Sequence, residues 1–254
     1  MATLQAQFGR IRRQANSKLT NQKQVFALDH DATAAHRFRR HLGSPIEETL
    51  REQDGQLTPP SYFATLLTLL EQQQGLNDGL HEPVLYLLAI VLPHTPTMIL
   101  RSKFTTMLGI LSSSIDLSQA DAPVIRSVIK VLEVLLTALD ANGWGQIIAQ
   151  KAMQSILILA TDPRPKVRKV AQEAATEILS RPPPVITQHP AAEAVATHCL
   201  DWLSDTKQHN PQALIHVLQL TKAVVPYWPI NMLEKLCEPL LQLPKANNTY
   251  VTTS

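Results

Sequence analysis

The chain has few of the residues on which several common protein classes depend. Glycine occurs 8 times and cysteine twice in 254 residues. So few glycines argue against an all-β fold and against the glycine-rich loops that cradle nucleotide phosphates. Two cysteines cannot build a disulfide framework, so we expect a reducing compartment. The longest apolar run, residues 84–92, is shorter than the ~18 apolar residues that a membrane-spanning helix needs.

Motifs of the main catalytic and metal-binding classes are also missing from the sequence. It contains no His-Glu-x-x-His, Cys-x-x-Cys or nucleophile-elbow pattern, and its carboxylates are dispersed. His30, His36 and His41 could bind a metal ion, but no cysteine lies near them, and a solvated basic segment fits them better. We therefore expect a protein that is not an enzyme and that uses no cofactor and no metal.

What the chain does have is apolar residues (44%) and 18 prolines. Prolines spaced along a leucine-rich chain are typical of helix starts and turns, and no alternating strand pattern lies between them. The pattern therefore predicts an all-α protein in which neighbouring helices run antiparallel. An Asn142-Gly143 break is expected between the fourth and fifth helices. The predicted helices span residues 58–73, 82–92, 95–114, 121–140, 146–160, 166–180, 191–203, 211–224 and 229–241.

The most specific local signal is the segment 146–180, which resembles a HEAT repeat. Its turn reads Thr-Asp-Pro-Arg-Pro-Lys-Val-Arg, and an alanine-rich helix follows. We expect Asp162 to cap the second helix and Val167 to face the first. Arg168 could pair with an equivalent acid in an adjacent unit. The alternative interpretation is an ordinary helical hairpin in a compact bundle.

A second, weaker copy of this pattern lies upstream and supports a repeat. Arg126 precedes Arg168 by 42 residues, which is a typical HEAT spacing. We therefore predict HEAT-like repeats over residues 44–244, arranged as a right-handed α-solenoid of HEAT/armadillo-type helical hairpins. The expected helix pairs are 58–92, 96–140, 146–180 and 191–224, with an incomplete pair from residue 229.

Charge is distributed unevenly along the chain. Residues 1–43 hold eight Lys/Arg and two Asp/Glu, whereas the remainder holds fifteen and nineteen. We divide the basic part into an amphipathic helix over 1–28 and an irregular basic insertion over 29–43. A basic arm before an acidic array favours a polyanion such as RNA, and the scarcity of aromatics favours phosphate contact over base stacking. A solvated helix face is the alternative. The predicted RNA-binding residues are Arg10, Arg12, Arg13, Lys18 and Lys23, and then Arg164, Lys166 and Lys169.

Residues 10–25 contain the string Asn-Ser-Lys-Leu-x-Asn-Gln-Lys. Residues 47–53 read Glu-Glu-Thr-Leu-Arg-Glu-Gln, and residues 58–70 include the Tyr62-Phe63 pair. These segments resemble the N-terminal part of the ribosomal RNA processing protein twelve family. In that family the string precedes HEAT repeats, and members are much longer, so we expect an N-terminal portion that ends in a polar tail over 245–254.

The resemblance implies a non-enzymatic HEAT scaffold in small-subunit ribosome assembly. It further implies pre-rRNA processing, export of the small-subunit precursor, and a nuclear and nucleolar location with shuttling to the cytoplasm. The implied partners are pre-rRNA, other assembly factors and the nuclear export machinery, without a membrane or a small-molecule substrate. The alternative functions are a karyopherin-like transport adaptor and a regulatory scaffold such as a phosphatase subunit. Acidic inner grooves with apolar pockets would favour transport, and a basic surface would favour RNA.

Overall fold

A computed structural model describes residues 58–72, 81–114, 120–204 and 211–242. Within these ranges every regular element is a helix, and each predicted helix that falls there is present. The α-helices are α4 (Pro59–Gln72), α5 (His81–Val91), α6 (Thr97–Ser114), α7 (Ala122–Thr137), α8 (Ala141–Trp144), α9 (Ile147–Leu159), α10 (Pro165–Ser180), α11 (Ala192–Ser204), α12 (Pro211–Val224) and α13 (Ile230–Gln242). Two short 3-10 helices, η1 (Leu92–His94) and η2 (Val225–Tyr227), follow α5 and α12.

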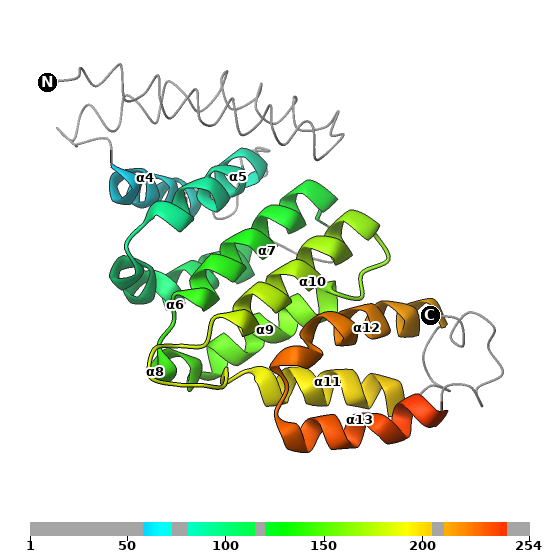
Figure 1. The fold of residues 1–254 in the computed structure, drawn as a ribbon. Helices are drawn as coiled ribbons and strands as arrows, with labels where there is room; N and C mark the ends of the chain where they lie inside the picture. Colours follow the sequence, from blue (N-terminus) through cyan, green and yellow to red (C-terminus); the bar gives the residue numbers. More distant parts are fainter. Residues whose placement is uncertain (1–57, 73–80, 115–119, 205–210, 243–254) are drawn as a thin grey trace, which may run out of the picture.

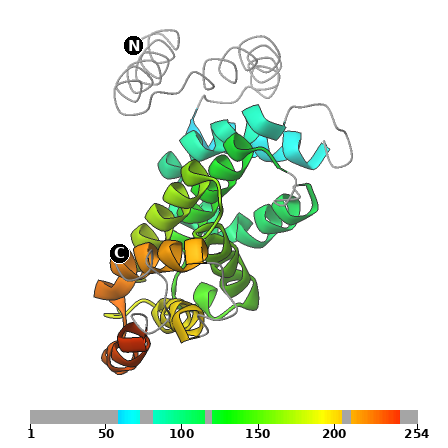
Figure 2. The ribbon, with the colours of Figure 1, turned by 90° about the vertical axis from the view of Figure 1, so that its right-hand side faces the viewer.

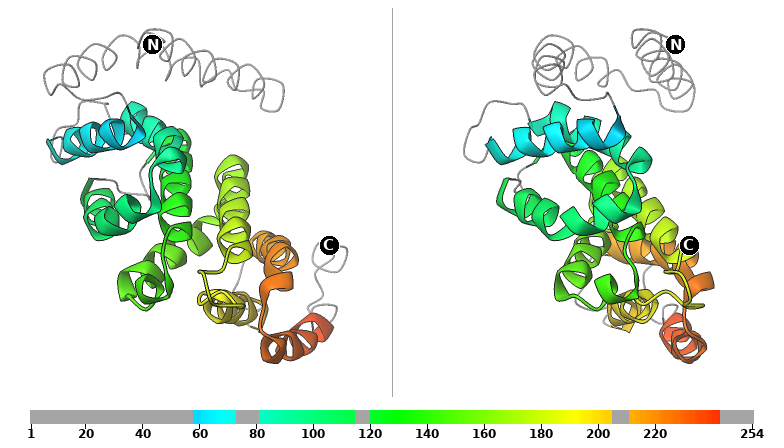
Figure 3. Two further views of the ribbon diagram at one scale, coloured as in Figure 1. Left: turned by 60° about the vertical axis from the view of Figure 1, so that its left-hand side comes forward. Right: turned by 90° about the vertical axis from the view of Figure 1, so that its left-hand side faces the viewer.

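The helices stack as antiparallel pairs in two layers. The pairs α4/α5, α6/α7, α9/α10 and α11/α12 pack within themselves, and α5, α7, α10 and α12 pack on one another in that order (Figure 1). We call these four helices the inner layer and α4, α6, α9, α11 and α13 the outer layer, because the array bends with the second set along its outer side (Figure 3). Figure 2 shows the stack running from α4 and α5 at one end to α13 at the other. This arrangement confirms the predicted pairs and the predicted all-α solenoid.

The core is one continuous apolar layer between the inner and outer helices. On α7 eight side chains between Ile125 and Leu136 are buried, and they cover more than one stripe of the helix, because α7 packs against α5, α6, α9 and α10. On α10 the buried side chains include Ala171, Ala174 and Ala175, all without solvent exposure. Small side chains at these positions let α10 lie close to both α7 and α9, against which it packs.

The segment after α7 differs from its prediction. The helix α7 ends earlier than predicted, at Thr137, and Asn142 and Gly143 do not form the break but lie inside α8, a single helical turn. The reason is Asp140, which is the N-cap residue and whose Oδ1 accepts a hydrogen bond from Gly143 N at 2.9 Å. The turn also buries Trp144, whose ring is 4% exposed. A cap and a buried aromatic therefore override the turn preference of the Asn-Gly pair.

Candidate nucleic-acid interface

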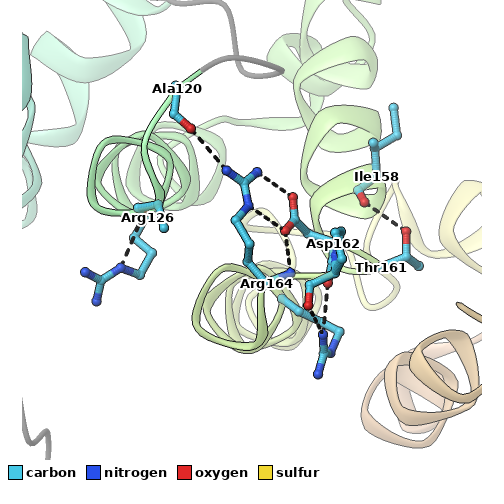
Figure 4. A network of polar contacts seen from close by, with 9 residues as sticks. Ala120, Arg126, Ile158, Thr161, Asp162 and Arg164 are labelled. Carbon is cyan, nitrogen blue, oxygen red and sulfur yellow. Dashed lines mark hydrogen bonds and ion pairs between the residues drawn. The ribbon is translucent and has the colours of Figure 1, made fainter. Parts of the chain in front are cut away.

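The turn between α9 and α10 is held by a carboxylate and a guanidinium that lie side by side (Figure 4). Arg164 Nε donates to Asp162 Oδ1 at 2.8 Å, and Arg164 Nη2 donates to Asp162 Oδ2 at 2.7 Å. The backbone N–H of Arg164 donates to the same Oδ1 at 2.8 Å. This two-pronged geometry is the strongest that an arginine and a carboxylate can form. We call the pair the Asp162–Arg164 clasp.

The clasp joins two consecutive units of the array. Arg164 Nη1 donates to the backbone oxygen of Ala120, two residues before α7, at 3.1 Å. The side chain of Asp162 is only 10% exposed, and that of Arg164 is 38% exposed. The hydrogen bond from Arg164 is the main cause that lowers the pKa of Asp162, and the same bond raises the pKa of Arg164. Both groups are therefore charged at neutral pH, and together they hold the starts of α7 and α10 next to each other.

The structure shows the roles of the three predicted repeat residues, Asp162, Arg168 and Val167. Asp162 is not the N-cap of α10, because Arg164 occupies that position, and Asp162 instead stabilises the turn before it. Arg168 donates to the backbone oxygens of Asp162 at 2.9 Å and Pro163 at 3.4 Å, so it closes its own turn rather than pairing with an acid of a neighbouring unit. Val167 is fully buried, as a residue facing the partner helix must be. Asp121 occupies the N-cap position of α7, and its side chain makes no capping bond.

Three cations, Arg126, Lys166 and Lys169, lie in the first two turns of α7 and α10, the two helices whose starts the clasp joins, and we call them the basic edge. Lys166 and Lys169 are exposed in the first turns of α10, and Lys169 lies 3.9 Å from a Glu173 carboxylate oxygen. Arg126 lies in the second turn of α7, and its Nε donates to Ala122 O at 3.4 Å (Figure 4). Two helix N-termini begin at this edge, and their partial positive charges add to the three cations. The edge can attract an anionic backbone.

The sequence-predicted RNA residues fall into two groups. Arg10, Arg12, Arg13, Lys18 and Lys23 lie outside the described residues, as do the predicted segments 1–28, 29–43 and 245–254. Arg164 differs from Lys166 and Lys169, because three groups of its guanidinium already donate to Asp162 and Ala120. Arg126 was not predicted as a contact residue, although its 42-residue offset from Arg168 placed it at an equivalent point of its repeat.

A groove between α10 and α12 is the other feature of the inner layer. Its lining carries both signs of charge, from Lys169, Glu173 and Glu177 at four-residue intervals on α10, and its only apolar lining residue is Ala223, on α12. Gln172 also lines the groove, and its Nε2 donates to the backbone oxygens of Ala160 at 3.0 Å and His216 at 3.1 Å. Gln172 thus fastens α10 to the end of α9 and to α12.

In the part of the chain that the structure describes, no three His, Cys, Asp or Glu side chains gather so that they could hold a metal ion. Among the described helices, none is both long enough and apolar enough to cross a membrane.

Comparison with known proteins shows the family to which this fold and sequence correspond. The model of the family described as "RRP12-like, N-terminal HEAT repeats" matches residues 40–254. The chain belongs to this family. It is 31% identical to Ribosomal RNA-processing protein 12 of Saccharomyces cerevisiae over 99% of the chain, and 28% identical to the RRP12-like protein of Homo sapiens over 87% of it. The match covers 22% of the yeast protein and 17% of the human protein, so the chain spans about a fifth of the length of these relatives.

This membership confirms the HEAT interpretation of the segment 146–180 over the alternative of a compact helical bundle. It also confirms the family resemblance carried by residues 10–25 and 47–70. Within the matched residues, the helix pairs α4/α5, α6/α7, α9/α10 and α11/α12 form four hairpins, and the Asp162–Arg164 clasp lies in the third.

Proposed function

We propose that this chain is part of a non-enzymatic HEAT scaffold for assembly of the small ribosomal subunit. Membership of the RRP12-like family carries the proposal, since relatives in yeast and human are named for ribosomal RNA processing or for likeness to such a protein. The scaffold acts in pre-rRNA processing and in nuclear export of the small-subunit precursor. Its location is the nucleus and nucleolus, with shuttling to the cytoplasm.

The mechanism rests on surfaces rather than on a reaction centre. Stacked hairpins present long curved surfaces, which suit contact with several assembly factors at once. The basic edge supplies cations at fixed spacing to RNA phosphates, because the Asp162–Arg164 clasp holds the starts of α7 and α10 together. Phosphate contact of this kind is independent of sequence and weakens with salt.

The transport-adaptor alternative finds less support in the described residues. It calls for an acidic inner groove with exposed apolar pockets. The groove between α10 and α12 carries both signs of charge and has one small apolar side chain in its lining. The proposal therefore keeps RNA and assembly factors as partners.

A charge-reversal experiment tests the RNA contact. The variant Arg126→Glu/Lys166→Glu/Lys169→Glu removes three phosphate contacts, so we expect weaker binding of a short labelled RNA hairpin. The slope of log affinity against log salt should become shallower by about 2 to 3. Fluorescence anisotropy over a salt series measures both quantities, and circular dichroism checks that the helices remain.

Two further variants sharpen the outcome. Lys222→Glu/Lys235→Glu changes exposed lysines on α12 and α13 and should leave the salt slope unchanged. Replacing Arg10, Arg12, Arg13, Lys18 and Lys23 by Glu tests the basic arm separately. If only the basic-arm variant loses affinity for the RNA hairpin, the basic edge is not the contact. If neither the basic-arm variant nor the basic-edge variant loses affinity, the proposal of direct RNA binding is wrong.

A further inference from the structure

The joint between the third and fourth hairpins is packed more thinly than the two joints before it. On the inner layer, α10 packs far more extensively on α7 than on α12. On the outer layer, α6 packs against both α4 and α9, whereas α11 packs on α12 and α13 and makes at most slight contact with α9. The units of a solenoid hold together through contacts with their neighbours, so the thin packing makes this joint weaker than the other two.

The same joint contains polar groups where an apolar core would be expected. The groove between α10 and α12 lies there, with Ala223 as its only apolar lining residue. Leu214, near the start of α12, is buried in a small cluster with Leu218 that is separate from the continuous core. His216 is also buried, and its Nδ1 makes no hydrogen bond within the described residues. Parting the joint lets water reach these polar groups, so it costs less free energy than parting an apolar contact.

The helices change direction at this joint. The helices α7 and α10 run side by side in nearly the same direction, whereas α12 turns away from it (Figure 1, Figure 2). Helices that cross touch over a shorter length than aligned helices, which accounts for the thin packing. The connection from α10 to α11, residues 181–191, is the longest that the structure describes from end to end. A connection of this length does not force the fourth hairpin to follow α10.

One side of the joint is fixed by an aromatic contact. The rings of His189 and Trp144 meet edge-on with centroids 4.6 Å apart, and His189 Nδ1 accepts a hydrogen bond from Ala191 N at 3.1 Å. Trp144 is the last residue of α8, and Ala191 comes directly before α11. The start of α11 is therefore held against the preceding unit, and any motion of the fourth hairpin has to turn about this point.

The other side of the joint is bridged by Gln172. Its Nε2 donates both to Ala160 O at 3.0 Å and to His216 O at 3.1 Å. Ala160 is the C-cap of α9, and His216 lies within α12, so one amide group connects the third unit to the fourth. Neutral hydrogen bonds of this kind contribute little net free energy, because water replaces them when they break.

We propose that this joint is a hinge of the array. The contact of His189 with Trp144 and Ala191 is the pivot, and Gln172 is a latch that holds α10 against α12 while both of its hydrogen bonds are formed. Opening the latch swings α11, α12 and α13 together away from α10, whereas the first three hairpins keep their arrangement. This motion changes the curvature of the inner layer, so the array can fit partners of different shape. The hinge does not depend on the proposed RNA contact.

Spin-label distances in the 254-residue chain test the hinge. Lys103→Cys on α6 is combined with one of two other exposed positions: Thr197→Cys on α11 lies across the joint, and Ser180→Cys on α10 does not. Both pairs are made with Cys237→Ser, because Cys237 is exposed and Cys199 is buried. Pulsed electron paramagnetic resonance gives the distribution of distances for each pair. We expect a wider distribution for the pair that spans the joint.

A latch variant separates the hinge from general flexibility. Gln172→Met nearly keeps the size of the side chain but cannot donate a hydrogen bond. It should widen the distribution of the joint-spanning pair further and leave that of the other pair unchanged. Gln150→Met, at an exposed glutamine of α9, is the matched control and should change neither distribution. Circular dichroism checks that each variant keeps its helices.

Three results would overturn the inference. The first is equal widths for the two pairs when Gln172 is present, which needs no latch variant and would mean that no joint is special. The second is a joint-spanning distribution that Gln172→Met leaves unchanged. The third is an equal widening of both pairs in Gln172→Met, which would mean that Gln172 supports the whole array rather than one joint.

Discussion

Arg164 shows how one cation can serve the fold rather than a ligand. Its Nε and Nη2 donate to Asp162, and its Nη1 donates to Ala120 of the preceding unit. An exposed lysine at this position would offer one point charge, whereas the planar guanidinium reaches two partners at fixed angles. The prediction that Arg164 contacts RNA stays untested, but its donors already have partners in the free chain.

The clasp predicts a specific stability pattern. Asp162→Ala should lower the free energy of unfolding at pH 7 by about 1 to 3 kcal/mol, because it strips a charged hydrogen-bond partner from Arg164. Arg164→Lys should lose most of the same amount although it keeps the charge. Urea unfolding followed by circular dichroism measures both.

An exposed ion pair provides the control for that experiment. Arg181 Nη2 pairs with Glu177 Oε1 at the end of α10, and their side chains are 63% and 39% exposed. Glu177→Ala should cost less than about 1 kcal/mol. If Arg164→Lys is as stable as the wild type, charge alone holds the turn and the two-pronged geometry is unimportant.

At the scale of elements, the connection from α10 to α11 depends on a buried histidine. His189 is 4% exposed, and its ring meets Trp144 edge-on, with centroids 4.6 Å apart. Its Nδ1 accepts a hydrogen bond from Ala191 N at 3.1 Å at the start of α11. The connection is therefore fastened to α8 of the preceding unit and to the helix that follows.

This histidine makes stability depend on pH. Burial lowers the pKa of His189 from 6.5 to about 4, so the folded state favours the neutral ring. The unfolded chain binds the proton first, and stability should fall as pH drops from 6.5 to 4, by at most about 3 kcal/mol from this residue. His189→Asn keeps an acceptor for Ala191 N and cannot titrate, so urea unfolding between pH 7 and 4 should show a flatter profile.

A second variant separates titration from packing. Trp144→Phe weakens the ring contact but leaves His189 titratable, so it should lower stability while keeping more of the pH slope than His189→Asn. Burial also lowers the pKa of His198 and His216, so a part of the slope remains in both variants. An unchanged slope in His189→Asn would show that this ring does not carry the effect.

Helix boundaries and pairs followed from local sequence, because prolines and polar caps act on the helices that they begin. Pro211 starts a helix where it was expected to, and α10 begins at Pro165, one residue before its predicted start. The short helix α8 was missed, since its formation depends on burial of Trp144 against a residue that lies 45 positions later, His189. Such a contact leaves no periodic signal in the sequence.

At the scale of the whole molecule, each unit contacts its neighbours and little else. The inner helices α7 and α10 pack against helices on several sides, whereas α13 packs mainly against α11 and exposes Ile230 (78%) and Leu241 (72%). The stability of such an array is close to a sum of unit and interface terms. The protection of backbone amides against hydrogen exchange should therefore differ from helix to helix along the chain.

Hydrogen exchange tests this expectation. Backbone amides of α7 and α10 should exchange slowest, those of α13 fastest, and α11 and α12 should be intermediate. Mass spectrometry of peptides from these helices at neutral pH provides the rates. One common opening rate for α7 and α13 would mean that the array unfolds as a single cooperative unit.

The sequence by itself determined the long helices, their pairing and the repeat, because proline, caps and apolar spacing act within a few residues of where they stand. It also singled out Lys166 and Lys169 as cations at an inter-helix turn. Only the tertiary structure decided that Arg164 is bonded to Asp162 and Ala120, and that the start of α7, the helix of Arg126, therefore lies beside the start of α10. These properties depend on residues brought together from different units, and the packing of one hairpin on the next sets those distances.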